Sequence, residues 1–340
     1  MDLPDVTVIN PEGKIFSELM EKEIENALNK EKPSRVILFL NRRGYAPFGK
    51  CYNCDWTARC RNCDISLTLH KKSNALICHH CGFRTKKIEI CPVCGKNVFY
   101  LGWGTQRIEE EIEEKYAEYS IKRMDTDSIT GRHAHEEIYS KLKKGEIKIL
   151  LGTQMVTKGL DLPDIGFVGV FSADTNLNFP DFRASEKTFQ LLSQVAGRAG
   201  RGEPGKVLIQ SSNPNHYAIK SASEHDFKLF YKEEIEFRKS ADYPPFTRLA
   251  RIIVKSKESQ KAEKASLKLK DTIERMPEVK RIIILGPVAC PIGKIEKYFR
   301  YHLLLKSNAS SVLQNILRRL YTEKIPGIKM SLEIDPVNML

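Results

Sequence analysis

Eight of the nine cysteines form four Cys-x-x-Cys pairs within one short stretch of the chain. A Cys-x-x-Cys turn directs two thiolates toward one point, and a structural zinc ion takes four such ligands in a tetrahedron. Two pairs can therefore close one zinc site, and four pairs predict two sites. The pairs are Cys51/Cys54, Cys60/Cys63, Cys78/Cys81 and Cys91/Cys94.

The residues between the second and third pairs indicate which pairs share an ion. Residues 65–70 and 75–77 alternate apolar and polar side chains around a polar tip at 71–74, which is typical of a β-hairpin. A hairpin returns to its own start, so it would bring the second and third pairs together. We therefore expect a nested arrangement, with Cys51, Cys54, Cys91 and Cys94 around one zinc ion and Cys60, Cys63, Cys78 and Cys81 around the other.

Disulfides and free structural thiols are the alternatives to zinc. Disulfides require an oxidising compartment, but no charged, apolar and small-residue signal segment opens this sequence, and Cys290 stands alone in an apolar context. The fourfold repetition of the spacing favours zinc over disulfides. A redox switch, in which oxidation releases the zinc, would use the same residues and stays open.

Composition and charge limit the classes of partner. A chain of 340 residues with 41% hydrophobic residues is sufficient for about two to three domains, each with its own core. The net charge of +12 favours a polyanionic partner, nucleic acid above all, although dispersed lysines on a solvated surface would give the same value. No apolar run approaches the ~20 residues that cross a bilayer. We expect a soluble, cytoplasmic protein without a membrane partner.

The elements on both sides of the cysteines predict an α/β domain. Residues 36–40 form a continuous apolar run, typical of a strand buried on both faces, and polar and basic residues including Arg42 and Arg43 follow it. Behind the cysteines, apolar runs alternate with amphipathic segments, which predicts a parallel sheet covered by helices on both faces. The predicted strands are 98–101, 121–124, 147–151 and 167–171, and the predicted helices are 17–29, 106–119, 134–143 and a helix that begins near 186.

Two stretches of this α/β region could meet a phosphate. Thr153 and Gln154 directly follow a buried strand, where small and hydroxyl residues let backbone amides approach a phosphate, and Lys158 can add a point charge. Arg198 and Arg201 stand three residues apart between glycines, so their guanidinium groups suit a concentrated phosphate charge. The structural alternative for the arginines is a helix C-cap, with Gly ending the helix and Arg meeting its dipole.

The C-terminal third predicts a separate α+β domain. A long helix over 217–239 leads to two prolines, which mark a boundary. The elements behind them follow the order βαββαβ, the ferredoxin-like arrangement. The predicted strands are 249–254, 281–285, 298–305 and 329–334, and the helices are 259–275 and 310–321.

Charged and aromatic residues alternate at one point of this C-terminal domain. Lys294, Lys297, Tyr298, Arg300 and Tyr301 mix charge with aromatic rings, as nucleic-acid platforms do. An RNA-recognition module has the same topology, but its aromatic consensus strand is absent from this sequence. Aromatic rings that pack on a sheet face, with lysines in water, explain these residues equally well.

Two motifs and their neighbourhood resemble a known family. Residues 149–159 and 194–201 resemble motifs V and VI in the second motor lobe of superfamily-two nucleic-acid helicases. Residues 39–47, followed at once by the eight cysteines, narrow the likeness to the primosomal protein N′ family of replication-restart helicases. The likeness extends from the first residues to Asp335-Pro336. It implies a RecA-like second helicase lobe over 1–48 and 97–240, an inserted double-zinc module with four cysteines per ion over 49–96, and the family's terminal domain over 241–340.

The resemblance also implies roles for single residues. Arg198 and Arg201 would face ATP as catalytic residues, and the zinc pairing would be nested. Gly159, Asp161 and Gln194 would couple the nucleotide cleft to the DNA track. The residues implied to lie near DNA are Arg42, Arg43, Thr105, Thr153, Gln154 and Lys158.

The resemblance implies a motor and its partners as well. The family uses ATP to move 3′ to 5′ along DNA at stalled forks, displaces strands and helps to reload the replicative helicase. The implied partners are forked or single-stranded DNA, single-stranded-DNA-binding protein and primosome proteins.

This sequence departs from the family because it lacks two motifs of the first motor lobe. It contains neither Gly-x-x-x-x-Gly-Lys-Ser/Thr nor Asp-Glu-x-His, the phosphate loop and the magnesium-binding motif of the first motor lobe. An arginine finger without a nucleotide cradle cannot turn over ATP. We therefore expect a fragment or truncated gene product, inactive alone, that uses ATP and Mg²⁺ only with a first lobe supplied elsewhere. A zinc-containing DNA-binding protein without ATPase activity and a zinc-thiol redox chaperone are the alternatives.

Overall fold

The computed structural model of the 340-residue chain contains two compact units. One unit consists of Met1–Ala46, Gly102–Phe179 and Arg183–Glu234, and the other of Pro47–Leu101, Pro180–Phe182 and Ile235–Leu340. No helix in the described ranges is both long and apolar enough to cross a membrane. The structure describes all residues except 1–2, 12–15, 30–33, 41–47, 52, 55, 57, 60, 62–66, 71–73, 78–82, 102–104, 125–133, 153–163, 172, 174–176, 178–180, 200–204, 212, 338 and 340.

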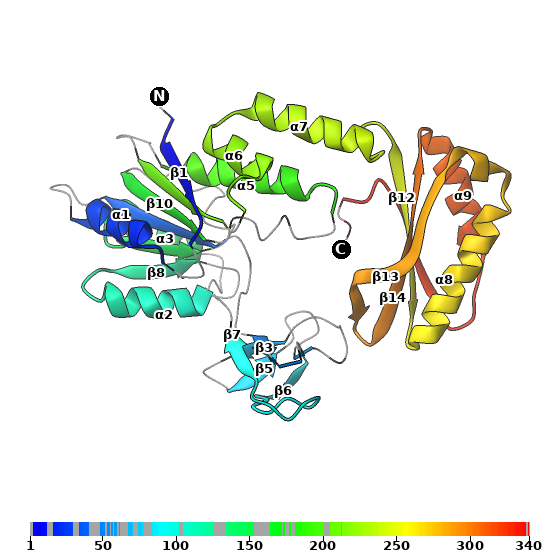
Figure 1. The fold of residues 1–340 in the computed structure, drawn as a ribbon, viewed down its shortest axis with the longest axis horizontal. Helices are drawn as coiled ribbons and strands as arrows, with labels where there is room; N and C mark the ends of the chain where they lie inside the picture. The colour runs from blue at the N-terminus through cyan, green and yellow to red at the C-terminus, as the bar shows by residue number, and fades with distance from the viewer. Residues whose placement is uncertain are drawn as a thin grey trace. The chain divides into compact units, whose positions relative to one another are not determined.

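A six-stranded sheet organises the first unit (Figure 1). Its strand order is β1-β11-β10-β2-β9-β8, and every neighbouring pair is parallel. The predicted parallel sheet is thus confirmed. The strands are β1 (Asp5–Ile9), β2 (Arg35–Leu40), β8 (Ile121–Met124), β9 (Ile149–Gly152), β10 (Ile165–Phe171) and β11 (Lys206–Gln210).

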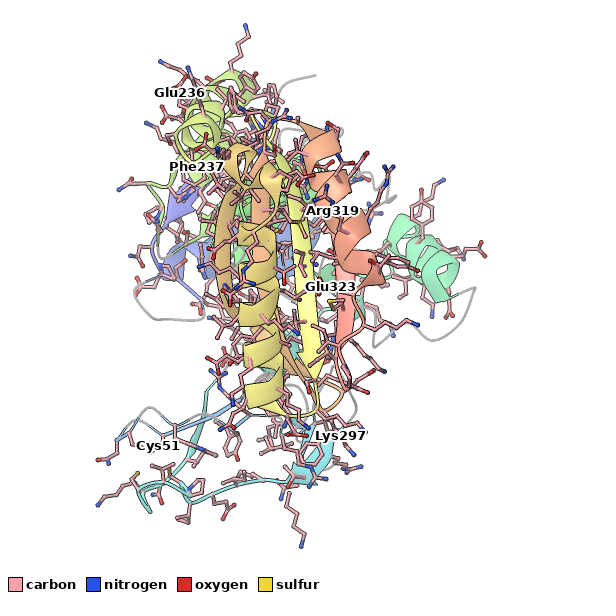
Figure 2. The ribbon with its side chains drawn as sticks, turned by 90° about the vertical axis from the view of Figure 1, so that its right-hand side faces the viewer. Cys51, Glu236, Phe237, Lys297, Arg319 and Glu323 are labelled. Atoms are coloured by element: carbon pink, nitrogen blue, oxygen red, sulfur yellow. The ribbon has the colours of Figure 1, made fainter. Side chains whose placement is uncertain are left out.

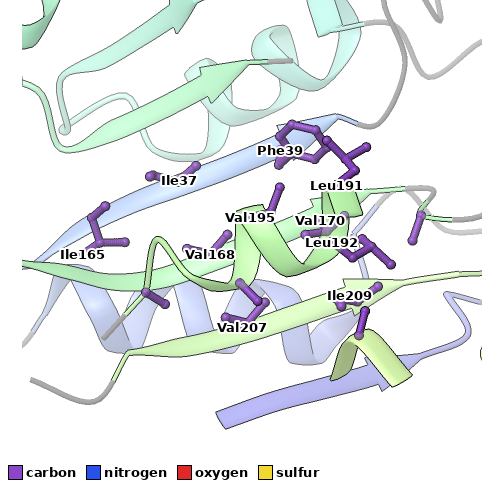
Figure 3. Close-up of a cluster of buried hydrophobic side chains, with 14 of the residues drawn as sticks. Ile37, Phe39, Ile165, Val168, Val170, Leu191, Leu192, Val195, Val207 and Ile209 are labelled. Carbon is purple, nitrogen blue, oxygen red and sulfur yellow. The ribbon is translucent and has the colours of Figure 1, made fainter. Parts of the chain in front are cut away.

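Helices cover both faces of this sheet. Along β2, Ile37 and Phe39 face a cluster formed with α3, α5 and α6, as Figure 3 shows for residues of α5. Val36 and Leu38 point to the opposite face, into a cluster formed with α1 and α2. This alternation is expected of a strand buried on both sides. The helices are α1 (Glu18–Leu28), α2 (Thr105–Lys115), α3 (Ala134–Lys143), α5 (Ala184–Ala196) and α6 (Tyr217–Ser223).

A glycine on β10 lets α1 approach the sheet closely. A Cβ atom on Gly169 would lie 2.6 Å from the Met20 sulfur and 2.9 Å from Leu38 Cδ2. Met20 itself is fully buried. The helix begins at the N-cap Ser17, whose hydroxyl accepts the Met20 backbone N–H at 3.1 Å. The same turn of α1 is therefore held by a cap and by close packing.

Two sequence predictions for this region are wrong. The strand predicted at 98–101 is β7 (Phe99–Leu101), but it pairs antiparallel with β3 (Phe48–Lys50) in a separate two-stranded sheet. The single helix predicted over 217–239 is two helices, α6 and α7 (Phe227–Ser240). His225 breaks it with a left-handed φ of 54°, and Asp226 Oδ1 then accepts the Leu229 backbone N–H at 2.8 Å as a new N-cap.

The C-terminal domain has the predicted ferredoxin-like topology. Its antiparallel sheet has the order β13-β14-β12-β15, and the chain order is βαββαβ. Ala250, Ile252 and Val254 of β12 pack against the two helices in the core. The elements are β12 (Arg248–Ser256), α8 (Ser259–Glu274), a 3₁₀ helix (Pro277–Arg281), β13 (Ile283–Ile295), β14 (Tyr298–Ser307), α9 (Ser310–Thr322) and β15 (Lys329–Ile334).

Strand β13 is much longer than predicted. Its register against β14 shifts between Leu285 and Val288 and again between Ala289 and Lys294. Such irregularities interrupt the alternation of apolar and polar residues that the strand prediction relied on.

Gly169→Val should destabilise the parallel-sheet domain by about 1–3 kcal/mol, because the new side chain would overlap Met20 and Leu38. Urea unfolding of the wild-type protein and of the variant measures the difference in the free energy of unfolding. In a Met20→Ala background the same substitution should cost less, since the sulfur it strikes is gone. Equal costs in the two backgrounds would contradict the proposed contact.

Candidate metal centre and motor segment

Four cysteine sulfurs converge in the cysteine-rich module. The Sγ atoms of Cys51, Cys54, Cys91 and Cys94 all lie within 4.8 Å of one another. The Cys51 and Cys94 sulfurs are 3.4 Å apart, and the Cys54 and Cys91 sulfurs are 3.6 Å apart. The structure therefore brings the first and fourth Cys-x-x-Cys pairs together.

Two backbone turns present these pairs at the end of the β3–β7 ribbon. The Cys51 N–H donates to the Trp56 carbonyl at 2.8 Å, and the Cys91 N–H donates to the Lys96 carbonyl at 2.7 Å. The second turn needs a glycine, because Gly95 has a φ of +70° while its N–H donates to the Cys91 carbonyl at 3.0 Å. Each pair thus lies in its own hydrogen-bonded turn, and the pairing of β3 with β7 brings the two turns together.

A small apolar core lies next to the sulfurs. The buried Cys51, Cys91 and Val98 pack with Ile88 and Tyr100. The Tyr100 hydroxyl donates to the Ile88 carbonyl at 2.6 Å and accepts the Ile88 N–H at 2.8 Å. These two bonds tie β7 to the chain that leads into the fourth cysteine pair.

The predicted hairpin is confirmed in the same module. Strand β4 (Thr68–His70) pairs antiparallel with β5 (Ala75–Ile77), which pairs with β6 (Arg84–Lys86). Asn74 supports the turn with a φ of 42°. Cys60, Cys63, Cys78 and Cys81 lie outside the described residues, so their pairing around a second ion stays a prediction.

The described cluster fits a zinc ion. A tetrahedral site with Zn–S bonds of ~2.3 Å separates its sulfurs by about 3.8 Å, close to the 3.4 Å and 3.6 Å found here. Four thiolates are a typical donor set for structural zinc. Cys51 and Cys91 are buried, which shields the centre from water on one side.

Four thiols at these distances compete for protons. The Lys96 backbone N–H, supported by the other three sulfurs, lowers the pKa of Cys94 to about 6. The Trp56 backbone N–H lowers the pKa of Cys54, but burial and the same sulfur neighbours outweigh it and raise that pKa to about 12. The cluster thus favours one thiolate at the expense of another, and a divalent cation would stabilise all four.

The segment predicted to face ATP continues directly from α5. The Gly197 N–H donates to the Ser193 carbonyl at 3.0 Å, and the Arg198 N–H donates to the Val195 carbonyl at 3.1 Å. Arg198 is half-buried, whereas Gln194 is exposed. The backbone at Arg198 is therefore an extension of the helix, tightened in its last turn.

Some of the other predicted motor residues follow two strands, β2 and β9, that lie side by side. Phe39 of β2 pairs with Gly152 of β9, so the chain leaves both strands at the same edge of the sheet. Thr105 is the first residue of α2, and its side chain is not described. Arg42, Arg43, Thr153, Gln154, Lys158, Gly159, Asp161 and Arg201 lie outside the described residues, and their roles stay predictions.

The charged and aromatic residues of the C-terminal domain make contacts within that domain. Lys294 Nζ lies 4.5 Å from the centroid of the Phe299 ring. Arg300 is buried, and its guanidinium donates to the Ile292 carbonyl at 3.2 Å. Figure 2 shows Lys297 at the β13–β14 turn, where its φ is 70°. A nucleic-acid platform at this place stays a prediction.

Sequence reasoning missed an ion pair of a buried arginine in the same sheet. Arg251 donates from Nε and from its terminal nitrogen to Glu333 Oε2, at 3.1 Å and 2.8 Å. The Arg251 side chain is only 6% exposed, and the two residues are opposite each other on β12 and β15. No local pattern in the sequence signals a pair that is formed only when these strands meet.

Three family models match successive parts of the chain. They are described as the helicase conserved C-terminal domain, over residues 85–203, the PriA DNA helicase Cys-rich region (CRR) domain, over residues 60–86, and the primosomal protein N C-terminal domain, over residues 239–337. Their order along the chain agrees with the resemblance found in the motifs.

Comparisons with curated proteins over the whole of this chain point to the same family. The replication restart protein PriA of Bacillus subtilis is 39% identical over 355 residues, which cover 99% of this chain and 43% of the relative. That of Treponema pallidum is 37% identical, with 99% and 51% covered. The chain belongs to the PriA family. It spans about half the length of the curated PriA relatives that it matches.

Membership of the PriA family confirms the fold class expected from the sequence. The parallel-sheet domain corresponds to the helicase C-terminal domain, the cysteine module to the PriA cysteine-rich region, and the ferredoxin-like domain to the PriA C-terminal domain. A third relative, from Thermotoga maritima, is 35% identical, with 98% of this chain and 44% of the relative covered.

Tyr100→Phe should destabilise the cysteine module by about 1–3 kcal/mol, because the Ile88 N–H and carbonyl both lose their partner. Thermal unfolding of the zinc-loaded protein measures the loss. Tyr119→Phe is the matched control, since its hydroxyl donates to Asn29 at an exposed site and should matter little. Equal losses from the two substitutions would rule out the role of the half-buried Tyr100 hydroxyl.

Proposed function

We propose that this chain is the second motor lobe, zinc module and terminal domain of an ATP-dependent 3′ to 5′ DNA helicase that acts in replication restart. The observation that carries the proposal is the helix α5, which extends into Arg198 beside a doubly wound parallel sheet. The matches to the helicase C-terminal domain and to proteins named replication restart protein support it.

In this proposal the arginines act on the nucleotide. Arg198 and Arg201 stabilise the negative charge that develops on the γ-phosphate, an effect worth on the order of a thousandfold in rate. The tightened end of α5 holds the Arg198 backbone in place for this contact. ATP and Mg²⁺ are bound by a first lobe, because the 340-residue sequence has no phosphate loop. Gly159, Asp161 and Gln194 couple the nucleotide to the DNA track.

We place the DNA track at the edge of the sheet where the carboxyl ends of β2 and β9 lie. Ligands of open α/β sheets bind outside the carboxyl ends of the strands. The chain leaves β2 and β9 at one edge, which supports a joint role of the residues that follow them. A net charge of +12 favours a DNA partner. The residues assigned to DNA are Arg42, Arg43, Thr105, Thr153, Gln154 and Lys158.

We assign two structural zinc ions to the module over 49–96, between the two halves of the motor lobe (1–48 and 97–240) and before the terminal domain (241–340). The geometry of the first and fourth cysteine pairs supports one ion. The β4–β5 hairpin supports the second ion, because an antiparallel hairpin returns the chain to its start and would bring the third cysteine pair back to the second. Single-stranded-DNA-binding protein and primosome proteins are the further partners proposed by family membership.

A second candidate is a zinc-containing DNA-binding protein without its own ATPase activity. The missing phosphate loop favours it, and it shares the same fold and zinc module. The two candidates differ in one respect, which is whether a first lobe restores ATP turnover that depends on Arg198.

Arg198→Ala should lower ATP turnover on the order of a thousandfold when this chain is combined with a first motor lobe and forked DNA. Zinc content and DNA affinity should stay unchanged. Lys187→Ala is the matched control, because it removes an exposed cation from the same helix and should retain turnover. Wild-type turnover in the Arg198 variant would contradict the catalytic assignment.

Cys54→Ser should leave one zinc ion per chain out of two, and Cys63→Ser should also leave one, because the two sites are independent. Metal analysis together with native mass spectrometry measures the count. Cys290→Ser is the control, since this buried cysteine belongs to the C-terminal sheet and should leave two ions bound. Loss of both ions from either single variant would contradict two separate sites.

A further inference from the structure

The chain behind α5 continues as a tight helical turn. The Arg198 N–H donates to the Val195 carbonyl at 3.1 Å. The Ala199 N–H donates to the Ala196 carbonyl at 3.0 Å. Both bonds span three residues, the spacing of a 3₁₀ turn, which often forms the last turn of an α-helix. The backbone before and after the Arg198 side chain is therefore ordered.

Gly197 does not end the helix as a left-handed cap. Its φ of −64° and ψ of 0° are angles that residues with a side chain also adopt. A Cβ atom at this position would lie 3.4 Å from the Ser193 carbonyl oxygen, which is close to ordinary contact. The special freedom of glycine is thus not what sets the course of the chain here, and the residues that follow must do so.

Three successive residues differ in their exposure. Gly197 is exposed, Arg198 is half-buried, and Ala199 is only 3% exposed. Ala199 belongs to the hydrophobic cluster on one face of the parallel sheet, together with Val195 and Ala196 of α5. Every member of this cluster lies in the unit that contains the parallel sheet. The core of that unit therefore holds the residue directly next to Arg198.

The helix that leads to this segment is itself firmly held. Leu192 and Val195 pack in the same cluster with residues of the sheet (Figure 3). Nearer the start of the helix, the Phe189 ring stacks on Phe230, with centroids 4.2 Å apart and planes 11° apart. Since α5 is restrained along its length, the place of Arg198 relative to the sheet depends on the short turn over 197–199.

We propose that Ala199 is a positioning residue, whose buried methyl group anchors the turn that carries Arg198. Helix ends fray where nothing holds them, and a residue buried just past the last helical turn opposes that fraying. This inference rests on the proposed function for the role of Arg198 at ATP. The anchor itself does not depend on that role, because it consists of contacts within one unit.

A purely structural role of Ala199 makes a different prediction. If its methyl group only filled the core, its loss would matter no more than the loss of another buried methyl group from the same cluster. Ala222 of α6 offers the matched control, since it is fully buried in that cluster and is distant from Arg198 in the sequence. Ala222→Gly should destabilise the domain at least as much, because glycine within a helix also costs backbone entropy.

Hydrogen–deuterium exchange of the full 340-residue, zinc-loaded chain tests the anchor without ATP. Ala199→Gly should speed amide exchange in residues 197–199 by about tenfold, after correction for intrinsic rates. Ala199→Ser should keep the wild-type rate, because it retains the β-carbon and its hydroxyl can bond a carbonyl of the preceding turn. Ala222→Gly should leave exchange in this segment unchanged.

Two results would overturn the anchor. One is unchanged exchange in residues 197–199 with Ala199→Gly, and the other is equal acceleration with Ala222→Gly. Should Ala199→Gly fail to fold, Ala199→Val gives the same comparison against Ala222→Val, because added methyl groups displace the turn from its place in the core.

Turnover in the assembly with a first lobe gives a second readout. Ala199→Gly should lower kcat about tenfold with little change in KM, because a mispositioned arginine loses contacts made in the transition state. Ala199→Ser and Ala222→Gly should retain kcat, and a loss of kcat with Ala222→Gly equal to that with Ala199→Gly would contradict the positioning role. In an Arg198→Ala background Ala199→Gly should have no further effect. If Arg198→Ala alone leaves turnover intact, the proposed function fails, while the exchange result still decides the anchor.

Discussion

The burial of β2 on both faces is the constraint on which the rest of the structure depends. Its side chains from Val36 to Phe39 are no more than 2% exposed, and its backbone pairs with β10 on one side and β9 on the other. Parallel neighbours cannot be joined by a short turn, so the chain between β2 and β9 must cross over. The cysteine module, α2, β8 and α3 all lie in that crossover. The sheet can therefore accept a large insertion without losing a strand.

The cysteine module has a small apolar core, which explains why its fold would depend on metal binding by its sulfurs. Its largest apolar cluster has only Ala58, Leu67, Leu69 and Leu76 as buried members among the described residues. A core of that size stabilises little, and small modules of this kind usually rely on metal ions or disulfides. The binding energy of a structural zinc ion is also folding energy. The four converging sulfurs thus belong to the fold of the module as much as to its chemistry.

Sequence patterns could predict the elements whose signal is local. The apolar runs of β2, β9 and β10 indicated the parallel sheet, the alternation around residues 71–74 indicated the β4–β5 hairpin, and the element order indicated the ferredoxin-like domain. The convergence of the first and fourth cysteine pairs likewise agrees with the expectation drawn from the hairpin between them.

The predictions that failed depend on contacts between distant segments. Strand β7 has an apolar sequence that would suit the main sheet, but its partner is β3. No local sequence pattern predicted this pairing. The amphipathic period of 217–239 continues across His225, so only the left-handed backbone there reveals the break. The ion pair of Arg251 and Glu333 joins residues far apart in the chain, and no spacing rule could have found it.

The central proposal is that this chain is one half of a two-lobe motor. The most direct measurement is ATP hydrolysis by the zinc-loaded 340-residue chain, alone and after addition of a first motor lobe, each with and without forked DNA. The account predicts no turnover by the chain alone and DNA-stimulated turnover once the first lobe is present. DNA-stimulated turnover by the chain alone, or none with the first lobe present, would contradict it.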